Sequence, residues 1–496
     1  MRKERIYFNG LLTQSKCILR YRTVIYIKYN IFGISYHVKL MKIVLKLVSI
    51  ALILFYSNLL LAQNKQQTNR KPNIIFITSD SHRASALSIN KHPVVQTPNL
   101  DKLAQEGVQF NQAYVATAIC VVSRASILTG QHVAKHKINS FGDKFSDEAF
   151  QRTYPMILKQ NGYRIGQIGT LGVGFNNPDQ KFNHWDTKIP WKNEKGVHQI
   201  DIISEKVANY LSEQKSDQPF YLAVSFEAAH EIDGKNGNPA TYLVQDRFKD
   251  LYKDQEMPRP QSISDDAFKS LPPFLQSDQN IPRTRWHGFF STDELHQENS
   301  RNYYRLITGI DDAVGNIVNK LKSLGLDENT VVIYTSDHGF SLGEHGFIGK
   351  WTGFQEAIHV PLIIRDFREN ASKKSRTDAL AINIDFGPTM LALAGIQIPN
   401  SMQGISLWNN SKKQRPKTSF FFYEHSTLGS PQLPKVEGIV SAEWKYLKYP
   451  EHDFEFLFNC KKDPLELTNL ANQPKHQKIL DRLRKLYDIE KANAQL

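Results

Sequence analysis

The chain has 496 residues, of which 41% are hydrophobic and 22% are charged, a composition typical of an ordinary globular protein and not of a disordered one. The formal net charge is +13, but residues 1–62 hold ten Lys or Arg against one acid, Glu4, so +9 of it belongs to this front segment. The remaining +4 is spread over the rest of the chain, which argues against nucleic acid as a partner.

The segment that begins at Met41 has the order typical of a secretory signal peptide. Basic residues precede an apolar run, and the small residue Ala62 stands before Gln63. The apolar stretch after Lys46 is short for a membrane span, which takes about 20 residues. We therefore expect cleavage after Ala62, a true start at Met41 with residues 1–40 as an upstream extension, and a secreted or periplasmic protein.

From residue 71 onward, apolar strands alternate with amphipathic helices. Residues 74–77 predict a strand, and residues 97–107 predict a helix that Thr97 caps and Gly107 ends. Further strands are predicted at 220–226, 331–334 and 360–366, and a helix is predicted from Leu306 to Leu321. Continuous apolar strands between amphipathic helices indicate an α/β fold with a large, mostly parallel central sheet flanked by helices.

The pattern changes twice after the second predicted strand. Residues 231–300 are polar and rich in proline, which predicts long loops. After residue 415 the sequence favours aromatic strands and then an amphipathic helix around Ile479 and Leu483. We expect a catalytic α/β domain over residues 63–414 and a smaller α+β subdomain over residues 415–496.

Two of the predicted strands end in the same tripeptide, Thr78-Ser79-Asp80 and Thr335-Ser336-Asp337. Ligands of open α/β sheets bind at the carboxyl ends of the strands. Two acids at that edge repel each other unless a cation lies between them, and carboxylate oxygens favour calcium or magnesium. His338 adds a nitrogen donor beside Asp337. The alternative is that each aspartate caps a following helix.

Several basic residues follow the same strands. His230 ends the segment FYLAVSFEAAH, so it is expected at the carboxyl edge of the sheet, whereas His345 and Lys350 lie in a glycine-rich loop after Asp337. His136 follows Cys120 at a distance that fits one helix and a turn. A lone histidine is more often structural than catalytic, and the order of the strand ends favours His230 over His345.

Cys120 opens the stretch Cys120-Val121-Val122-Ser123-Arg124, which continues to Leu128-Thr129-Gly130. Most free cysteines are buried small apolar residues, and Cys120 and Cys460 make no disulfide framework. The stretch nevertheless resembles the modification signature of the type I, formylglycine-dependent sulfatases of the alkaline-phosphatase-like superfamily. Residues 335–350 and 357–362 are most similar to iduronate-2-sulfatase-like members, and Lys445-Tyr446 and residues 463–470 resemble the family's C-terminal subdomain.

The resemblance implies a specific chemistry. Cys120 would be oxidised by a maturation enzyme to formylglycine, whose hydrated form attacks the sulfur of a sulfate ester. The implied ligands of a calcium ion are Asp80, Cys120, Asp337 and His338. The implied catalytic residues are Cys120, Arg124, His136, His230 and Lys350.

In these implied roles, Arg124 braces the nucleophile and Lys350 holds the sulfate. His230 protonates the leaving sugar oxygen, and His136 takes the proton of the second hydroxyl. The expected substrate is a sulfated polysaccharide or its oligosaccharide fragments. Tryptophans that suit sugar stacking, although core packing is their commoner fate, are Trp185, Trp191 and Trp286.

The chain departs from the family pattern at four positions. Ser81 stands where a second acid is usual, and Val122 stands where proline or alanine is usual. Thr170 and Gly172 replace a lysine and a histidine that would contact sulfate, for which Lys135 or His184 could compensate. These departures keep two alternatives open: a phosphoester or phosphonate hydrolase of the same superfamily, and a non-catalytic glycan-binding relative.

Overall fold

The computed structural model describes residues 37, 39–55, 70–214, 218–234, 240–368, 376–408, 415 and 418–496. The chain forms two compact units, Met1–Arg70 and Lys71–Leu496. In the first unit, residues 39–55 are helical and exposed. Among the helices in these ranges, none combines the length and the apolarity needed to cross a bilayer. The predicted cleavage point at Ala62 lies outside the described residues.

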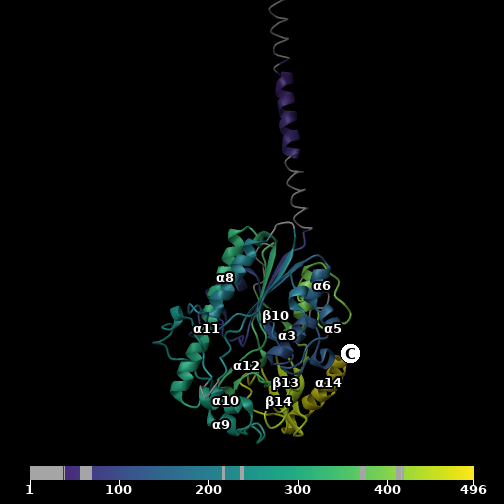
Figure 1. The fold of residues 1–496 in the computed structure, drawn as a ribbon. Helices are drawn as coiled ribbons and strands as arrows, with labels where there is room; N and C mark the ends of the chain where they lie inside the picture. The colour runs from purple at the N-terminus through teal and green to yellow at the C-terminus, as the bar shows by residue number, and fades with distance from the viewer. Residues whose placement is uncertain are drawn as a thin grey trace, which may run out of the picture. The chain divides into compact units, whose positions relative to one another are not determined.

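An eight-stranded sheet with the order β10-β2-β9-β6-β1-β5-β3-β4 is the centre of the second unit (Figure 1). Its strands, in chain order, are β1 Asn73–Ser79, β2 Val108–Tyr114, β3 Arg164–Gly169, β4 His184–Asp186, β5 Phe220–Phe226, β6 Thr330–Ser336, β9 Leu362–Asp366 and β10 Arg376–Ile382. Only β9 runs antiparallel to its neighbours in this sheet, so the predicted mostly parallel sheet is confirmed.

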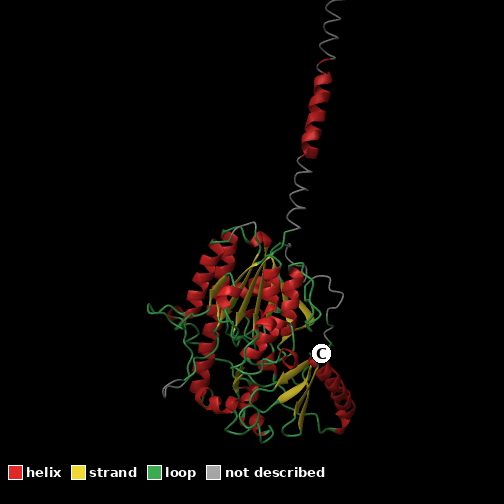
Figure 2. Ribbon diagram, turned by 45° about the vertical axis from the view of Figure 1, so that its right-hand side comes forward, coloured by secondary structure: helices red, strands yellow, loops and turns green. Residues whose placement is uncertain are grey.

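Helices cover both faces of this sheet (Figure 2). Side chains alternate along β1, so Ile74 and Phe76 enter one core, whereas Ile75 and Ile77 enter the other. The first core is covered by α3 Cys120–Thr129, α6 Tyr154–Gln160 and α13 Phe386–Leu393. The second is covered by α2 Pro98–Glu106, α8 Gln199–Ser212 and α11 Asp293–Ser323.

Capping residues in the sequence account for where two of these helices begin and end. Helix α2 has Pro98 in its first turn and is followed by Gly107, as predicted. Thr97 occupies the predicted N-cap position, but its hydroxyl donates to the Asp101 carboxylate and does not cap a helix amide. Helix α11 begins earlier than predicted, at Asp293, because the Thr292 side chain accepts a hydrogen bond from the amide of Leu295.

The prediction of long loops over residues 231–300 is wrong in part. Two short helices lie there, α9 Asp265–Lys269 and α10 Ile281–Phe289, in addition to the first turns of α11. The Ser264 side chain caps α9 by accepting from the amide of Ala267. Helices of five and nine residues are too short to show a clear 3.6-residue period.

The C-terminal part is an antiparallel sheet with one long helix, which confirms the predicted α+β subdomain. Its elements are β11 Phe421–His425, β12 Val436–Val440, β13 Trp444–Tyr449, β14 Phe454–Asn459 and α14 Gln477–Gln495. Leu480, Leu483 and Tyr487 of α14 share a core with Ile439 and Tyr446 of the sheet. The shorter elements of the chain are α4 Val133–His136, α5 Asp147–Gln151, α7 Pro178–Lys181, α12 Gln355–Ile358, β7 Ser341–Leu342 and β8 Ile348–Gly349.

Candidate active site

The two TSD tripeptides lie side by side at the carboxyl edge of the sheet. Strands β1 and β6 are parallel neighbours, and their register pairs Thr78 with Thr335 and Ser79 with Ser336. Asp80 and Asp337 therefore leave adjacent strands at the same level. The repeated tripeptide therefore reflects the register of two neighbouring strands, which brings two buried carboxylates to the same place.

Arg124 of α3 binds both carboxylates through their Oδ2 atoms. Its Nε lies 2.8 Å from Asp337 and its Nη2 lies 3.1 Å from Asp80. Its Nη1 donates to the main-chain oxygen of Thr170 at 2.9 Å. Burial lowers the pKa of the guanidinium, but the two aspartates outweigh burial and raise it. Arg124 therefore stays charged and offsets one of the two negative charges.

The Oδ1 atoms of the two aspartates face His338. Its Nε2 lies 3.3 Å from Asp80 and 3.6 Å from Asp337. Its Nδ1 lies 2.8 Å from the main-chain oxygen of Gly339 and so carries a proton. Nε2 is buried and has no hydrogen-bond partner among the described residues. Burial lowers the pKa of His338, but chiefly Asp337 outweighs this and raises the pKa to about 10.

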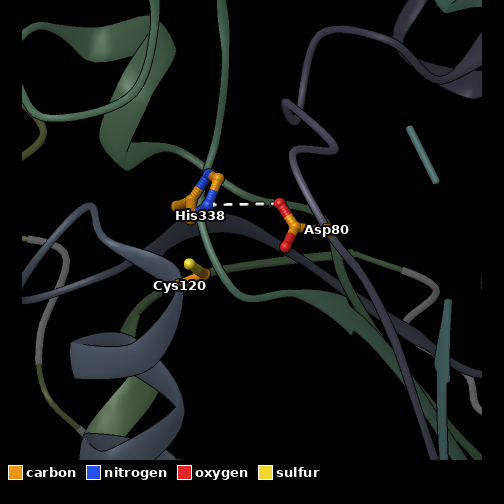
Figure 3. Close-up of side chains that lie close together, drawn as sticks. All are labelled: Asp80, Cys120 and His338. Carbon is orange, nitrogen blue, oxygen red and sulfur yellow. Dashed lines mark ion pairs between the residues drawn. The ribbon is translucent and has the colours of Figure 1, made fainter. Parts of the chain in front are cut away.

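These atoms form a donor set that fits a divalent cation. One donor atom each from Asp80, Cys120 and His338 lies within 4.8 Å of the others (Figure 3). The Oδ1 atoms of Asp80 and Asp337 lie 3.3 and 3.6 Å from Nε2 of His338, a nitrogen that binds an ion only when the ion displaces its proton. Carboxylate oxygens suit calcium or magnesium. Three of the four predicted ligands, Asp80, Cys120 and His338, meet in this group, and Asp337 adjoins it through Oδ1, 3.6 Å from Nε2 of His338.

Cys120 is the first residue of α3, and its position is fixed by the next turn. The Ser123 hydroxyl donates to the main-chain oxygen of Asp337, and the Asn383 amide donates to the Ser123 hydroxyl at 2.9 Å. Sequence analysis missed Asn383, although a polar residue directly after the apolar end of a strand is a usable signal. Burial raises the pKa of Cys120, but Lys350 and His338 outweigh it, so the pKa is lowered and the thiolate is favoured.

Lys350 lies next to this cluster, in the loop that follows β8. It is buried, and its charge interactions with Cys120 and Asp80 outweigh burial, so its pKa is raised and it stays charged. The amide of Trp351 donates to the main-chain oxygen of Ala118 at 3.0 Å, which ties this loop to the segment before Cys120. The loop thus holds a fixed cation beside the cysteine.

His230 follows β5, the other parallel neighbour of β1, and its side chain is 19% exposed. Burial raises the pKa of Asp80, but Lys350, His230 and His338 outweigh it and hold the pKa well below its usual value. His230 therefore reaches the cluster from the edge that faces solvent.

His136 is not brought to the cluster. Its Nε2 lies 3.0 Å from the Ser126 hydroxyl, and its Nδ1 accepts from the amide of Ile138 at 3.0 Å, so both ring nitrogens are occupied. Ser126 stands six residues after Cys120, which is about 9 Å along a helix. The predicted role of His136 as a base therefore has no supporting contact. His345 stacks on Phe354 with the ring centres 4.1 Å apart, and it is also a packing residue.

The two residues that could compensate for the missing cations lie elsewhere. His184 pairs with Gly166 near the start of β3, away from the carboxyl edge, and packs against the Tyr210 ring. Lys135 lies on α4, beyond the far end of α3 from Cys120, and lines a cavity with residues of the C-terminal helix.

All three predicted sugar-stacking tryptophans make packing contacts. Trp185 packs on Phe175 and Phe182, Trp191 contacts His198, and Trp286 lies under the guanidinium of Arg283.

The loop that departs from the family pattern closes over Arg124. Thr170 offers only its main-chain oxygen to the guanidinium. Gly172 has a φ of +77°, and a Cβ built there would lie 2.7 Å from Cδ of Arg124. The arginine therefore fills the space beside residue 172, which leaves no room for the histidine expected from the family.

Comparisons with known proteins agree with this arrangement. The sulfatase family model matches residues 72–396, and the model of the N-sulphoglucosamine sulphohydrolase C-terminal region matches residues 343–493. An N-acetylglucosamine-6-O-sulfatase of Bacteroides thetaiotaomicron is 26% identical, over 86% of this chain and 87% of that protein. An ulvan-active sulfatase of Formosa agariphila is 25% identical, over 84% and 81% respectively.

A solved structure shows the same fold. It is a complex of a protein with its substrate D-glucosamine-2-N,6-O-disulfate, and it superposes with a TM-score of 0.72 and 24% identity. The match covers 86% of this chain and 98% of that one. Because the family model spans most of the chain and the family's sulfatases align along nearly their whole length, the chain belongs to the sulfatase family and is a sulfuric ester hydrolase.

Proposed function

We propose that the protein is a secreted sulfatase that hydrolyses sulfate esters on a sulfated polysaccharide or its oligosaccharide fragments. The observation that carries this proposal is the convergence of Cys120 at a helix start with two carboxylates, an arginine and a buried lysine. The relatives named for action on N-acetylglucosamine-6-sulfate and ulvan support a sulfated glycan as the substrate class.

The proposed nucleophile is a formylglycine made from Cys120 by a maturation enzyme, and the proposed cofactor is a calcium ion. When formed, the aldehyde hydrate supplies an oxygen nucleophile for covalent attack on sulfur. When bound, the calcium ion supplies charge that offsets the anionic sulfate. Asp80, Asp337 and His338 would hold it, together with the modified residue 120.

The chain's own residues perform the remaining tasks. Arg124 locks Oδ2 of both aspartates, so their Oδ1 atoms stay directed at one place. Lys350 presents a buried, permanently charged ammonium that binds a sulfate oxygen. His230, which is partly exposed to solvent, donates a proton to the leaving sugar oxygen.

Sulfate release from purified protein tests this function. We expect sulfate to appear from a sulfated glycan panel, and we expect the Cys120 peptide to show the mass deficit of cysteine-to-aldehyde conversion. Release of phosphate from phosphoesters or of phosphonate without any sulfate release would favour the phosphoester or phosphonate alternative. Glycan binding without any turnover would favour the non-catalytic one.

Export is proposed on the basic, apolar and small-residue order from Met41 to Ala62. The mature chain is expected to begin near Gln63. N-terminal sequencing of protein recovered outside the cytoplasm measures this directly, and a mature chain that begins near Met1 would contradict it.

A prediction for the Thr170–Gly172 loop follows from the position of Arg124. Gly172→Ala is expected to destabilise the protein and to lower sulfate release, because its Cβ displaces the guanidinium. Gly196 is the matched control, since it has the same φ of +77° but nothing within 4 Å of a built Cβ. Gly196→Ala should cost only the backbone strain, about 1–2 kcal/mol, with unchanged turnover. Equal losses of stability and turnover in the two variants, measured by chemical unfolding and sulfate release, would refute the contact.

A further inference from the structure

The residue after His230 is a buried carboxylate that the proposed chemistry has not used. The side chain of Glu231 is only 2% exposed. Its Oε1 binds Nη2 of Arg285, whereas its Oε2 lies 3.6 Å from Nδ1 of His230. Oε2 has no hydrogen-bond partner within the part of the chain that the structure describes. Because an unpartnered buried carboxylate oxygen is costly, this oxygen indicates a function directed at His230.

The hydrogen bonds of His230 fix which ring nitrogen carries the proton. Nδ1 lies 2.5 Å from the main-chain oxygen of Glu231, which can only accept. Nδ1 is therefore the donor, and the Glu231 carboxylate lies on the same side of the ring. No described residue is hydrogen-bonded to Nε2. This leaves Nε2 as the nitrogen that can carry a second, transferable proton.

Arg285 holds the carboxylate in place from another part of the chain. It lies on α10, and it also binds Asp233 at 3.1 Å and stacks over the Trp351 ring at 5.7 Å. Trp351 directly follows Lys350, whose ammonium lies 5.7 Å from the same ring. Burial raises the pKa of Glu231, but His230 and Arg285 outweigh burial and lower it. Glu231 therefore stays ionised although it is buried.

We infer that Glu231, held by Arg285, is the positioning residue that keeps His230 oriented for proton donation from Nε2 to the leaving group. This inference rests on the proposed sulfatase function. In the step, the nucleophilic hydroxyl of residue 120 loses its proton to solvent and its oxygen bonds to sulfur, while the bond from sulfur to the ester oxygen breaks. The electron pair of the broken bond stays on that oxygen, which takes the proton from Nε2. His230 is left neutral, with Nδ1 still donating to the main-chain oxygen of Glu231, and water restores the proton to Nε2.

The test uses leaving groups that differ in their need for a proton. The probes are 4-nitrophenyl sulfate, whose phenolate leaves unaided, phenyl sulfate, and a simple alkyl sulfate, whose oxygen needs the proton most. Since general acid catalysis contributes about 10²- to 10⁴-fold, Glu231→Gln is expected to lower kcat for the alkyl sulfate by about 10- to 100-fold. Its kcat for 4-nitrophenyl sulfate should stay within about threefold of the unchanged protein.

Asp233→Asn is the matched control. Asp233 binds the same guanidinium, but its side chain is 68% exposed and, among the described residues, forms no hydrogen bond or ion pair with His230. This variant should therefore follow the unchanged protein on all three probes. Retained 4-nitrophenyl sulfate activity in Glu231→Gln also reports that the variant is folded. An equal loss on all three probes, or the same leaving-group dependence in Asp233→Asn, would overturn the role of Glu231. Absence of turnover by the unchanged protein on every sulfate ester would refute the proposed function itself.

Discussion

Cys120→Ser is expected to release at most one molecule of desulfated alcohol per protein molecule and to keep the sulfate as a covalent ester, and Cys120→Ala is expected to release neither alcohol nor sulfate. A serine supplies one hydroxyl, so a sulfate ester formed on it has no second hydroxyl on the same carbon to expel the sulfate. Both variants should fold, because Cys120 lies at the start of α3 and the helix is held by Ser123 and Asn383 and not by the thiol. The expected stability change is about 1 kcal/mol or less.

Cys460 provides the matched control for this experiment. It is the other free cysteine of the described residues, and burial and Glu466 raise its pKa to about 12, so it stays an inert thiol. Cys460→Ala should keep full turnover. A burst experiment that counts the alcohol product released per protein, together with the mass of the peptide that contains position 120, separates the outcomes. Sustained turnover by Cys120→Ser would contradict the formylglycine mechanism and indicate a structural role for the cysteine.

The sheet and its two aspartates could be predicted because the information is local. Apolar runs bounded by polar residues mark β1, β5 and β6, and a repeated tripeptide at two strand ends marks a shared edge. The direction of β9 could not be predicted, because an apolar run reads the same in parallel and antiparallel pairing. Strands β2 and β10 carry polar residues on part of their length, so the sequence shows no continuous apolar run that would predict a strand there.

The side chains that reach the site from distant segments were harder to predict. His136 follows Cys120 closely in sequence, but the chain runs away from the site along α3, so its ring meets Ser126. Arg285 comes from a stretch predicted as loop, 54 residues after Glu231, and yet the two side chains form a partly buried ion pair. The number of residues between two positions does not predict whether their side chains meet. That depends on the direction of the helix and on the path of the segment between them.

Asp80→Ala and Asp337→Ala are each expected to abolish most of the calcium-dependent turnover and stabilisation. Each variant removes one of the Oδ1 atoms that converge with Nε2 of His338, which are 3.3 and 3.6 Å from it. A cation that binds only the folded protein stabilises it by about 2.7 kcal/mol at 100 times its Kd. The variants should lose this increment, because the ion loses one of its two carboxylate ligands.

The increment is measured as the difference in unfolding free energy with calcium and with a chelator, so that stability changes unrelated to the ion cancel. Asp311→Asn is the matched control. Asp311 is also a buried aspartate, but its carboxylate accepts from the amides of Asn99 and Leu100 on α2 and not from the residues of the cluster. Its replacement should lower the unfolding free energy equally with and without calcium, because amide donors are left unpaired in both conditions.

If Asp80→Ala instead kept the full calcium increment and full turnover, the paired strand ends would not be the cation site, and Arg124 alone would account for the two carboxylates. Magnesium in place of calcium, titrated in the same way, then distinguishes which ion the three donors prefer, since the smaller ion demands a more regular octahedral geometry.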